Sequence, residues 1–171
     1  MLVGHYIKRE LETLFVHRFS NETMPFFNLF KNSFHYWVLN GSSAYFLLHP
    51  KYTSPSWASD NVSVVLFVLF WIFEFMNGQC HLVLKNLRKP GTRERGIPYG
   101  WGFSQISCAN YFWESLSWLT FSISTQVAMA YVFTLVSFGQ MLIWAIKKHK
   151  NYKKEFGDKY PKRYVMVPFI I

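Results

Sequence analysis

The segment from residue 77 to residue 114 carries polar and cationic side chains between two apolar stretches. Apolar sequence leads into it from Val62 and leaves it from Leu116. Such groups at the edge of a bilayer are costly unless they bind a partner. We therefore predict that this segment binds an anionic cofactor. The residues behind this hypothesis are Asn77, His81, Arg88, Lys89, Arg93, Arg95, Asn110, Tyr111 and Glu114.

The loop between Leu87 and Phe103 places its cations among glycines and prolines. Arginine suits phosphate in a bidentate geometry, and glycine lets backbone amides approach it closely. A GxGxxG motif between a strand and a helix is missing from this sequence, so a Rossmann site is not supported. The alternative is simple attraction of the cations to anionic lipid headgroups. Composition alone does not separate phosphate binding from lipid binding.

Tyr111 lies between Asn110 and Glu114 at the start of an apolar helix. A tyrosine hydroxyl can polarise a carbonyl or deliver a proton when a neighbouring charge tunes it. The alternative role is interfacial anchoring, which is common for tyrosine. His149 and Tyr152 are neighbours at i, i+3 on the last helix, where the alternative is an exposed basic end.

Composition favours a membrane protein over a nucleic-acid-binding protein. The chain is 51% hydrophobic and 20% aromatic, which suits lipid faces and interfacial belts. Its net charge of +9 comes from 18 Lys and Arg against 9 Asp and Glu, and the positive-inside rule explains many of these cations. The six histidines never fall within five positions of one another, and the two cysteines form no CxxC motif. We predict no metal site.

The clearest membrane-spanning segment runs from Val62 to Leu84. At 100° per residue, Glu74, Asn77 and His81 fall on one stripe, continued by Lys85 and Arg88. An intramembrane carboxylate and amide predict a functional face, although the stripe could also contact neighbouring helices.

The apolar residues 113–146 favour a tight helical hairpin. The basic loop 85–112 and the basic tail 147–163 should both lie in the cytosol, which requires an even number of crossings between them. Phe34 to Leu48 is short for a full span.

Residues 1–18 form a short helix with Tyr6, on which Lys8 and Arg9 lie at helical spacings from Glu12. Composition alone favours a solvated amphipathic turn there.

The order of the motifs resembles the C-terminal domain of the steroid 5α-reductase superfamily. The matching positions are Asn77, Leu87–Gly91, Ile97–Pro98, Gly102–Phe103, Ser107, Asn110–Tyr111, Glu114, His149–Tyr152, Tyr160–Pro161 and Val167–Phe169. The stretches Glu12–Ser20, Thr23–Pro25 and Asn28–Asn32 are similar to its branch of very-long-chain trans-2-enoyl-CoA reductases. The resemblance covers essentially all 171 residues.

This resemblance implies an all-α fold, a polytopic transmembrane helical bundle with cytosolic loops capping a cofactor site. Residues 1–171 would be one membrane domain without the N-terminal region of the family. The implied reaction is NADPH-dependent reduction of trans-2-enoyl-CoA to saturated acyl-CoA in very-long-chain fatty-acid elongation. The implied location is the endoplasmic reticulum membrane, as a multi-pass protein. The implied partners are a long-chain enoyl-CoA substrate, the lipid bilayer and other elongation enzymes, without nucleic acid.

The resemblance also assigns site residues. Cofactor-contacting positions match Asn77, Arg88, Asn110, Glu114, His149 and Tyr152. Tyr6 matches the catalytic tyrosine of the steroid reductases, whereas Lys8 and Tyr111 match the pair implicated among enoyl-CoA reductases. The proton donor therefore stays open between Tyr6 and Tyr111. The steroid reductases carry an acidic residue where this chain has His81, and they differ at Arg95 and Gly96.

Three alternative functions remain at this point. They are a steroid or polyprenol double-bond reductase, a membrane methyltransferase of the isoprenylcysteine type, and an inactive truncated membrane partner of elongation enzymes.

Overall fold

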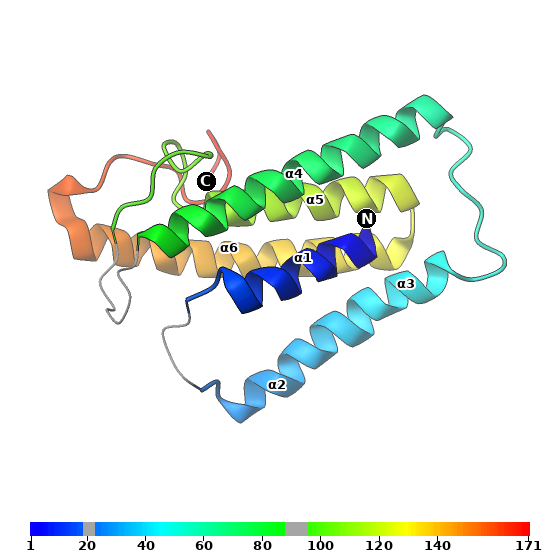
Figure 1. Ribbon diagram of the computed structural model, residues 1–171, viewed down its shortest axis with the longest axis horizontal. Coiled ribbons are helices and arrows are strands. Elements are labelled where there is room, and N and C mark those ends of the chain that lie inside the picture. Colours follow the sequence, from blue (N-terminus) through cyan, green and yellow to red (C-terminus); the bar gives the residue numbers. More distant parts are fainter. Residues whose placement is uncertain (19–22, 88–95) are drawn as a thin grey trace.

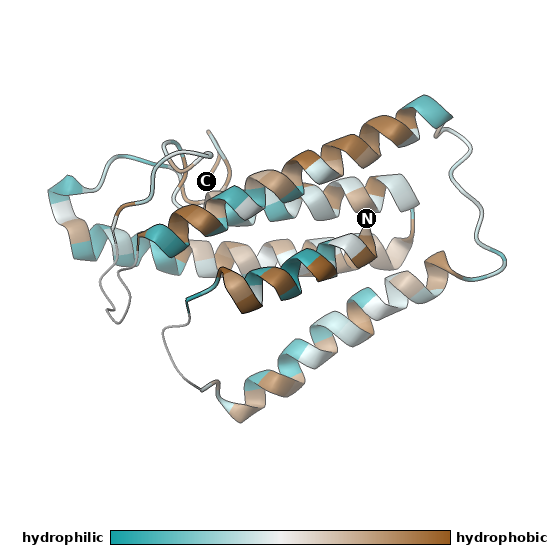
Figure 2. Ribbon diagram, viewed as in Figure 1, coloured by the Kyte–Doolittle hydropathy of each residue, from teal (hydrophilic) through white to brown (hydrophobic). Residues whose placement is uncertain are grey.

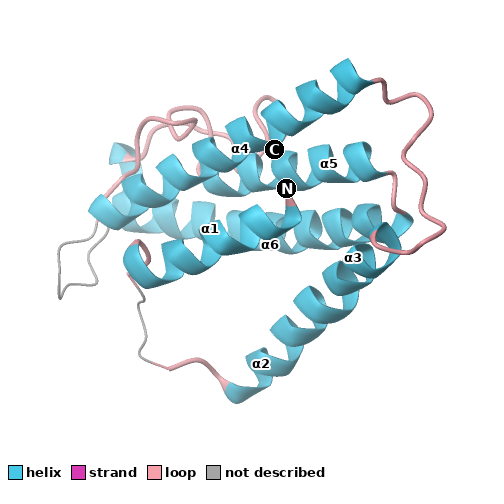
Figure 3. Cartoon of the chain, turned by 45° about the vertical axis from the view of Figure 1, so that its right-hand side comes forward, coloured by secondary structure: helices cyan, strands magenta, loops and turns pink. Residues whose placement is uncertain are grey.

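The computed structural model describes residues 1–18, 23–87 and 96–171 and shows an all-helical chain (Figure 1). In order, the elements are α1 (Leu2–Phe15), α2 (Phe26–Ser33), the π-helix η1 (Phe34–Asn40), α3 (Gly41–Leu47), α4 (Asp60–Asn86), α5 (Ala109–Thr125), α6 (Ala128–Phe156) and the 3-10 helix η2 (Gly157–Lys159). Figure 3 shows no strand, and among the described residues β-pairing is limited to one isolated bridge between Ile106 and Tyr164. The predicted all-α class is confirmed.

The core lies where α4, α5 and α6 pack side by side. Phe70 of α4, Trp118 of α5 and Phe133 of α6 are at most 2% exposed. The Trp118 and Phe133 rings meet edge to face with centroids 4.7 Å apart, a favoured geometry for aromatic pairs. Full burial of each such side chain contributes roughly 1.5–3 kcal/mol. This aromatic cluster fixes the three helices that carry most of the candidate site.

The predicted hairpin over residues 113–146 is present as α5 and α6. Gln126 ends α5 in the left-handed conformation, with φ of 52°, and its backbone N–H donates to the Ser122 carbonyl. The Gln126 side chain donates to the Ile123 carbonyl at 3.0 Å and to the Tyr131 hydroxyl at 2.7 Å. These bonds offset the cost of a left-handed non-glycine residue and close the turn. That the hairpin crosses a membrane twice stays a prediction.

α4 is an apolar helix whose surface is largely uncovered. Ser59 caps its N-terminus by accepting a 3.4 Å hydrogen bond from the Val62 N–H. Within the described ranges, Asp60–Asn86 and Ala128–Lys159 are long and apolar enough to cross a membrane. Only 17% of the most apolar window of α4 is buried in the protein, so its exposed apolar faces suit lipid (Figure 2). These two apolar helices therefore suggest a membrane protein.

The segment from α2 through η1 to α3 forms one arm of the structure (Figure 1). Its middle is a π-helix, a rare helix type that often marks functional positions. Asn40, at the end of η1, is 2% exposed and donates a 2.5 Å hydrogen bond to the Tyr6 hydroxyl. The arm therefore contacts α1 through the Tyr6 hydroxyl.

α1 corrects the expectation of a solvated turn. His5 is 2% exposed and Glu12 is 6% exposed, since α1 lies against α4. Composition could not reveal this burial because the partners of these charges lie some 69 residues away on α4. The local pairs of Lys8 and Arg9 with Glu12, at 3.2 Å and 3.1 Å, are confirmed.

The C-terminal segment returns to the end of the bundle that carries the α6 lysines. α6 continues to Phe156, so the first part of the predicted tail is helical. Beyond η2, the Tyr164 carbonyl accepts from the Ser107 N–H at 2.9 Å, and the Val165 carbonyl accepts from the Cys108 N–H at 3.1 Å. These two hydrogen bonds hold the C-terminal segment against the loop that precedes α5.

Candidate active site

A buried charge network joins α1 to α4. Lys8 Nζ lies 2.6 Å from Asn77 Oδ1, 3.1 Å from Glu74 Oε2 and 3.2 Å from Glu12 Oε1. His5 Nδ1 lies 2.8 Å from the other oxygen of Glu74. Glu74 is only 2% exposed, and a buried carboxylate needs such partners. The predicted stripe on α4 therefore faces α1, which supplies its counter-charges.

Asn77 links this network to α5. Its Nδ2 donates to the Asn110 carbonyl at 2.9 Å and to Glu114 Oε2 at 3.4 Å, while its Oδ1 accepts from Lys8. Both sides of the Asn77 amide are thus engaged by other residues of the chain. Asn77 positions Asn110 and Glu114 and ties them to α1.

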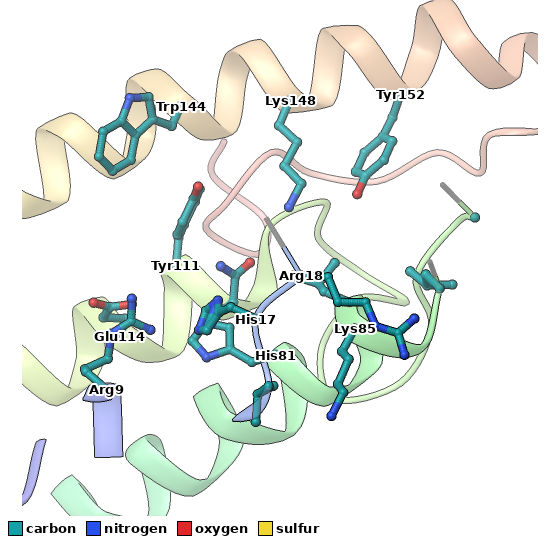
Figure 4. Close-up of a pocket in the computed structure, with 15 residues that line it drawn as sticks. Arg9, His17, Arg18, His81, Lys85, Tyr111, Glu114, Trp144, Lys148 and Tyr152 are labelled. Atoms are coloured by element: carbon teal, nitrogen blue, oxygen red, sulfur yellow. The ribbon is translucent and has the colours of Figure 1, made fainter. Parts of the chain in front are cut away.

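Between α1, α4, α5 and α6 lies a cavity of about 360 Å³, here called the inner cavity (Figure 4). Small-molecule sites typically measure about 300–1,000 Å³. The lining residues are Arg9, Val16, His17, Arg18, His81, Leu84, Lys85, Leu87, Gly96, Asn110, Tyr111, Glu114, Trp144, Lys148 and Tyr152. Four of these are lysines or arginines and only one is a carboxylate, so the cavity favours an anionic ligand.

Asn110 contributes a buried polar side chain to the lining of the inner cavity. Asn110 is 5% exposed, and its Oδ1 is buried without a hydrogen-bond partner among the described residues. An unpaired buried acceptor costs free energy, about 1–3 kcal/mol, that a bound donor would recover. An amide or hydroxyl donor of a ligand fits this position.

Tyr111 reaches from α5 toward α6, between Trp144 and Lys148 (Figure 4). Its ring centroid lies 6.3 Å from that of Trp144 and 5.9 Å from Lys148 Nζ. Burial raises the pKa of the Tyr111 hydroxyl to about 12, which keeps it a hydrogen-bond donor at physiological pH. Tyr111 can therefore donate to a ligand oxygen in the inner cavity.

Tyr6, the other candidate proton donor, lies elsewhere. Burial raises the pKa of its hydroxyl to about 12 as well, although the Asn40 hydrogen bond opposes that shift. The Tyr6 ring packs against the aromatic core cluster, and Tyr6 is absent from the lining of the inner cavity. The two tyrosines therefore lie in different surroundings: Tyr6 packs against the core, and Tyr111 faces the inner cavity.

Glu12, His17 and His81 bring a carboxylate oxygen and two ring nitrogens within 4.8 Å of one another. Burial alone would raise the pKa of Glu12, but the hydrogen bond from His81 and the charges of His81, Lys8 and Arg9 lower it to about 2. Lys8 and Arg9 both pair with the Glu12 carboxylate, and their positive charges disfavour binding of a divalent metal ion there. We therefore interpret this cluster as part of the charge network.

The remaining predicted site residues are divided between two places. Tyr152 lines the inner cavity, as do Asn110 and Glu114. His149 is absent from that lining, and its Nδ1 lies 2.6 Å from Ser107 Oγ. Arg88 lies outside the described residues. The cavity is also lined by Arg9, Lys148 and Trp144, which the sequence analysis assigned to no site. From the sequence, Arg9 was interpreted as a local partner of Glu12 and Lys148 as part of the cytosolic basic tail. The sequence pattern that could have identified Trp144 and Lys148 is their i, i+4 spacing with Tyr152, which puts all three on one face of the helix.

Comparison with known proteins gives a consistent match. Residues 22–171 match the family model described as 3-oxo-5-alpha-steroid 4-dehydrogenase. The chain is 48% identical over 168 residues to a protein of Dictyostelium discoideum named very-long-chain enoyl-CoA reductase, covering 98% of this chain and 55% of the relative.

Two animal relatives extend the match. The chain is 48% identical over 174 residues to a probable very-long-chain enoyl-CoA reductase of Caenorhabditis elegans, covering 98% of this chain and 56% of the relative. It is 36% identical over 172 residues to a human protein named trans-2,3-enoyl-CoA reductase-like, covering 98% of this chain and 47% of the relative. The chain therefore spans about half the length of the curated relatives it matches.

Proposed function

Because the chain belongs to the 3-oxo-5-alpha-steroid 4-dehydrogenase family, we propose that it reduces the carbon–carbon double bond of a trans-2-enoyl-CoA with NADPH. The names of the relatives support the substrate class. The observation that carries the proposal is the inner cavity, where a buried, unpartnered Asn110 oxygen and the Tyr111 hydroxyl share one basic chamber.

The residues of the inner cavity fit a phosphorylated nicotinamide cofactor. Asn110 Oδ1 offers an acceptor for a carboxamide N–H, and the cations Arg9, Arg18 and Lys148 suit phosphate. Tyr152 adds an aromatic face. Glu114 completes the polar end of the site, held by Asn77. On the resemblance alone, we also assign Arg88 to a phosphate of the cofactor. We assign His149 to a cofactor contact through its Nε2, because its Nδ1 is bonded to Ser107.

When bound, NADPH supplies hydride to the β-carbon of the enoyl thioester. Tyr111 donates a hydrogen bond to the thioester oxygen, where negative charge develops. A preorganised donor of this kind is worth roughly 3–4 kcal/mol in comparable sites. The α-carbon then takes a proton from water, and the product is the saturated acyl-CoA. Lys8 acts on this site indirectly through Asn77, which positions Asn110 and Glu114.

The wider setting follows from the same proposal. The two apolar helices support a membrane location, and we assign the chain to the endoplasmic reticulum as a multi-pass protein with its basic loops in the cytosol. The basic loop and tail cap the cofactor site from that side. The product would serve very-long-chain fatty-acid elongation, in company with the other enzymes of that cycle.

Binding of the cofactor can be tested apart from turnover. Purified protein titrated with NADPH should show saturable binding, and Asn110→Leu should weaken it. The exposed Asn32 offers a matched control, since Asn32→Leu removes an amide far from the cavity lining. Arg88→Ala should raise the NADPH requirement more than it lowers turnover. Equal NADPH affinity in wild type and Asn110→Leu would remove the main support for the site.

A second candidate is reduction of a steroid or polyprenol double bond with the same cofactor. The description of the matched family model favours it. Purified protein supplied with NADPH should consume it with a C16 or longer trans-2-enoyl-CoA and not with a 4-ene-3-keto steroid. The reverse preference would replace the enoyl-CoA proposal with the steroid one.

A further inference from the structure

A second cavity of about 680 Å³, here called the outer pocket, runs along the lysine-rich end of α6. Its lining residues are Tyr111, Trp144, Lys147, Lys148, Asn151, Tyr152, Lys154 and Glu155. All but Tyr111 come from consecutive turns of α6, at spacings that keep them on one face. The pocket therefore follows α6 over the twelve residues from Trp144 to Glu155, or roughly 16 Å.

The outer pocket and the inner cavity share a wall. Tyr111, Trp144, Lys148 and Tyr152 line both. A reductase that uses a nucleotide cofactor on a coenzyme A ester must hold two phosphorylated adenosines apart while their reacting ends meet. A shared wall that contains Tyr111, the proposed donor, meets this geometric requirement.

The chemistry of the outer pocket suits a phosphorylated nucleotide. Lys147, Lys148 and Lys154 present three ammonium groups against the single carboxylate of Glu155. Lysine binds phosphate as a point charge. Trp144 is 47% exposed and presents an indole on which a base can stack. Anionic lipid headgroups would be satisfied by the lysines alone, so the aromatic wall favours a nucleotide.

We propose that the outer pocket binds the 3′-phosphoadenosine diphosphate end of the coenzyme A substrate, with the pantetheine arm directed toward Tyr111. This inference rests on the proposed function, because it assigns a place to the nucleotide of the substrate proposed above. It leaves the inner cavity for the cofactor. The lysines of α6 then serve the substrate in addition to orienting the helix in the membrane.

Direct binding tests the pocket without turnover. Adenosine 3′,5′-diphosphate should bind the purified full chain in the presence of saturating NADPH. The double variant Lys147→Ala/Lys154→Ala should weaken that binding by about tenfold or more. The matched control is Lys159→Ala/Lys162→Ala, which removes two exposed lysines of the same tail that line neither cavity. The control should bind like wild type, and NADPH affinity should stay constant in both.

Two results of the binding assay would overturn the proposal. One is equal affinity for adenosine 3′,5′-diphosphate in wild type and Lys147→Ala/Lys154→Ala. The other is loss of binding to phosphatidylserine vesicles in that variant without loss of nucleotide binding, which would make the pocket a headgroup surface.

A comparison of two substrates separates this proposal from the proposed function. The enoyl thioester of N-acetylcysteamine carries the reacting group without the nucleotide. Lys147→Ala/Lys154→Ala should raise KM for the enoyl-CoA about tenfold and leave KM for the short thioester unchanged. If wild type reduces enoyl-CoA and the variant keeps its KM, the pocket assignment fails alone. If wild type binds the nucleotide but reduces neither thioester, the proposed function fails and the pocket stands.

Discussion

Lys8 donates a 2.6 Å hydrogen bond to the side-chain oxygen of Asn77, across the contact between α1 and α4. The same ammonium also pairs with Glu12 and Glu74. Asn77 in turn donates to α5, so a continuous polar path joins the first helix to the inner cavity. Through this path a change at Lys8 would reach the inner cavity, although Lys8 does not line it.

Replacing Lys8 should chiefly reduce stability. Lys8→Met leaves Glu74, which is 2% exposed, with His5 as its remaining partner, and breaking a buried ion pair costs about 3–5 kcal/mol. Thermal unfolding in detergent should show this loss, whereas Lys51→Met, at an exposed lysine, should not. Adding Glu74→Gln to Lys8→Met should recover part of the stability. A wild-type unfolding midpoint with lost turnover would instead give Lys8 a direct chemical role.

Removing the Tyr111 hydroxyl should slow the reaction without weakening cofactor binding. Tyr111→Phe keeps the ring against Trp144 and deletes the donor, so kcat should fall about 10²–10³-fold while the NADPH Kd stays nearly unchanged. Tyr6→Phe, which loses only the bond from Asn40, should lower kcat far less. Full activity in Tyr111→Phe together with none in Tyr6→Phe would move the assignment to Tyr6.

The alkaline pH profile should show the raised pKa of Tyr111. Burial raises this pKa to about 12, and the protonated hydroxyl is the active donor, so activity that depends on it is lost only as pH rises through that value. The kcat should therefore not decline between about pH 8 and pH 10 on account of this group. A decline with an apparent pKa near 10 that is absent in Tyr111→Phe would show that the hydroxyl ionises normally.

The long apolar helices could be predicted from local sequence. The apolar run from Val62 to Leu84 corresponds to α4, and the polar break near Gln126 corresponds to the turn of the hairpin. Both signals are local, because helix periodicity and the interruption of an apolar run involve neighbouring residues. The stripe of Glu74, Asn77 and His81 was also predicted correctly as one face.

What faces that stripe could not be predicted. Glu74 meets His5, and His81 meets Glu12, each across 69 residues of sequence. A single sequence does not show such long-range pairing, so α1 was interpreted as solvated. For the same reason, sequence spacing placed His149 beside Tyr152 but did not reveal that Ser107 binds its ring.

Ser107 should prove important for the C-terminal segment. Its hydroxyl accepts from the Tyr160 hydroxyl at 2.7 Å and lies 2.6 Å from His149 Nδ1, and Ser107 is fully buried. Ser107→Ala leaves two buried polar groups without that partner, which should cost about 1–3 kcal/mol. Hydrogen exchange should increase in residues 160–171. The exposed Ser104 is the control, and equal exchange in Ser107→Ala and Ser104→Ala would refute this role.

Gly4 should tolerate no added methyl group without loss of stability. A Cβ there would lie 2.4 Å from Cη2 of Trp71, so α1 approaches α4 closely only because this residue is glycine. Overpacking costs about 1–3 kcal/mol, against a gain in helix propensity of about 1 kcal/mol. Gly4→Ala should therefore lower the unfolding midpoint. Gly139→Ala, with open space around its Cβ in α6, should raise it, and a Gly4→Ala variant as stable as Gly139→Ala would show that Trp71 moves aside freely.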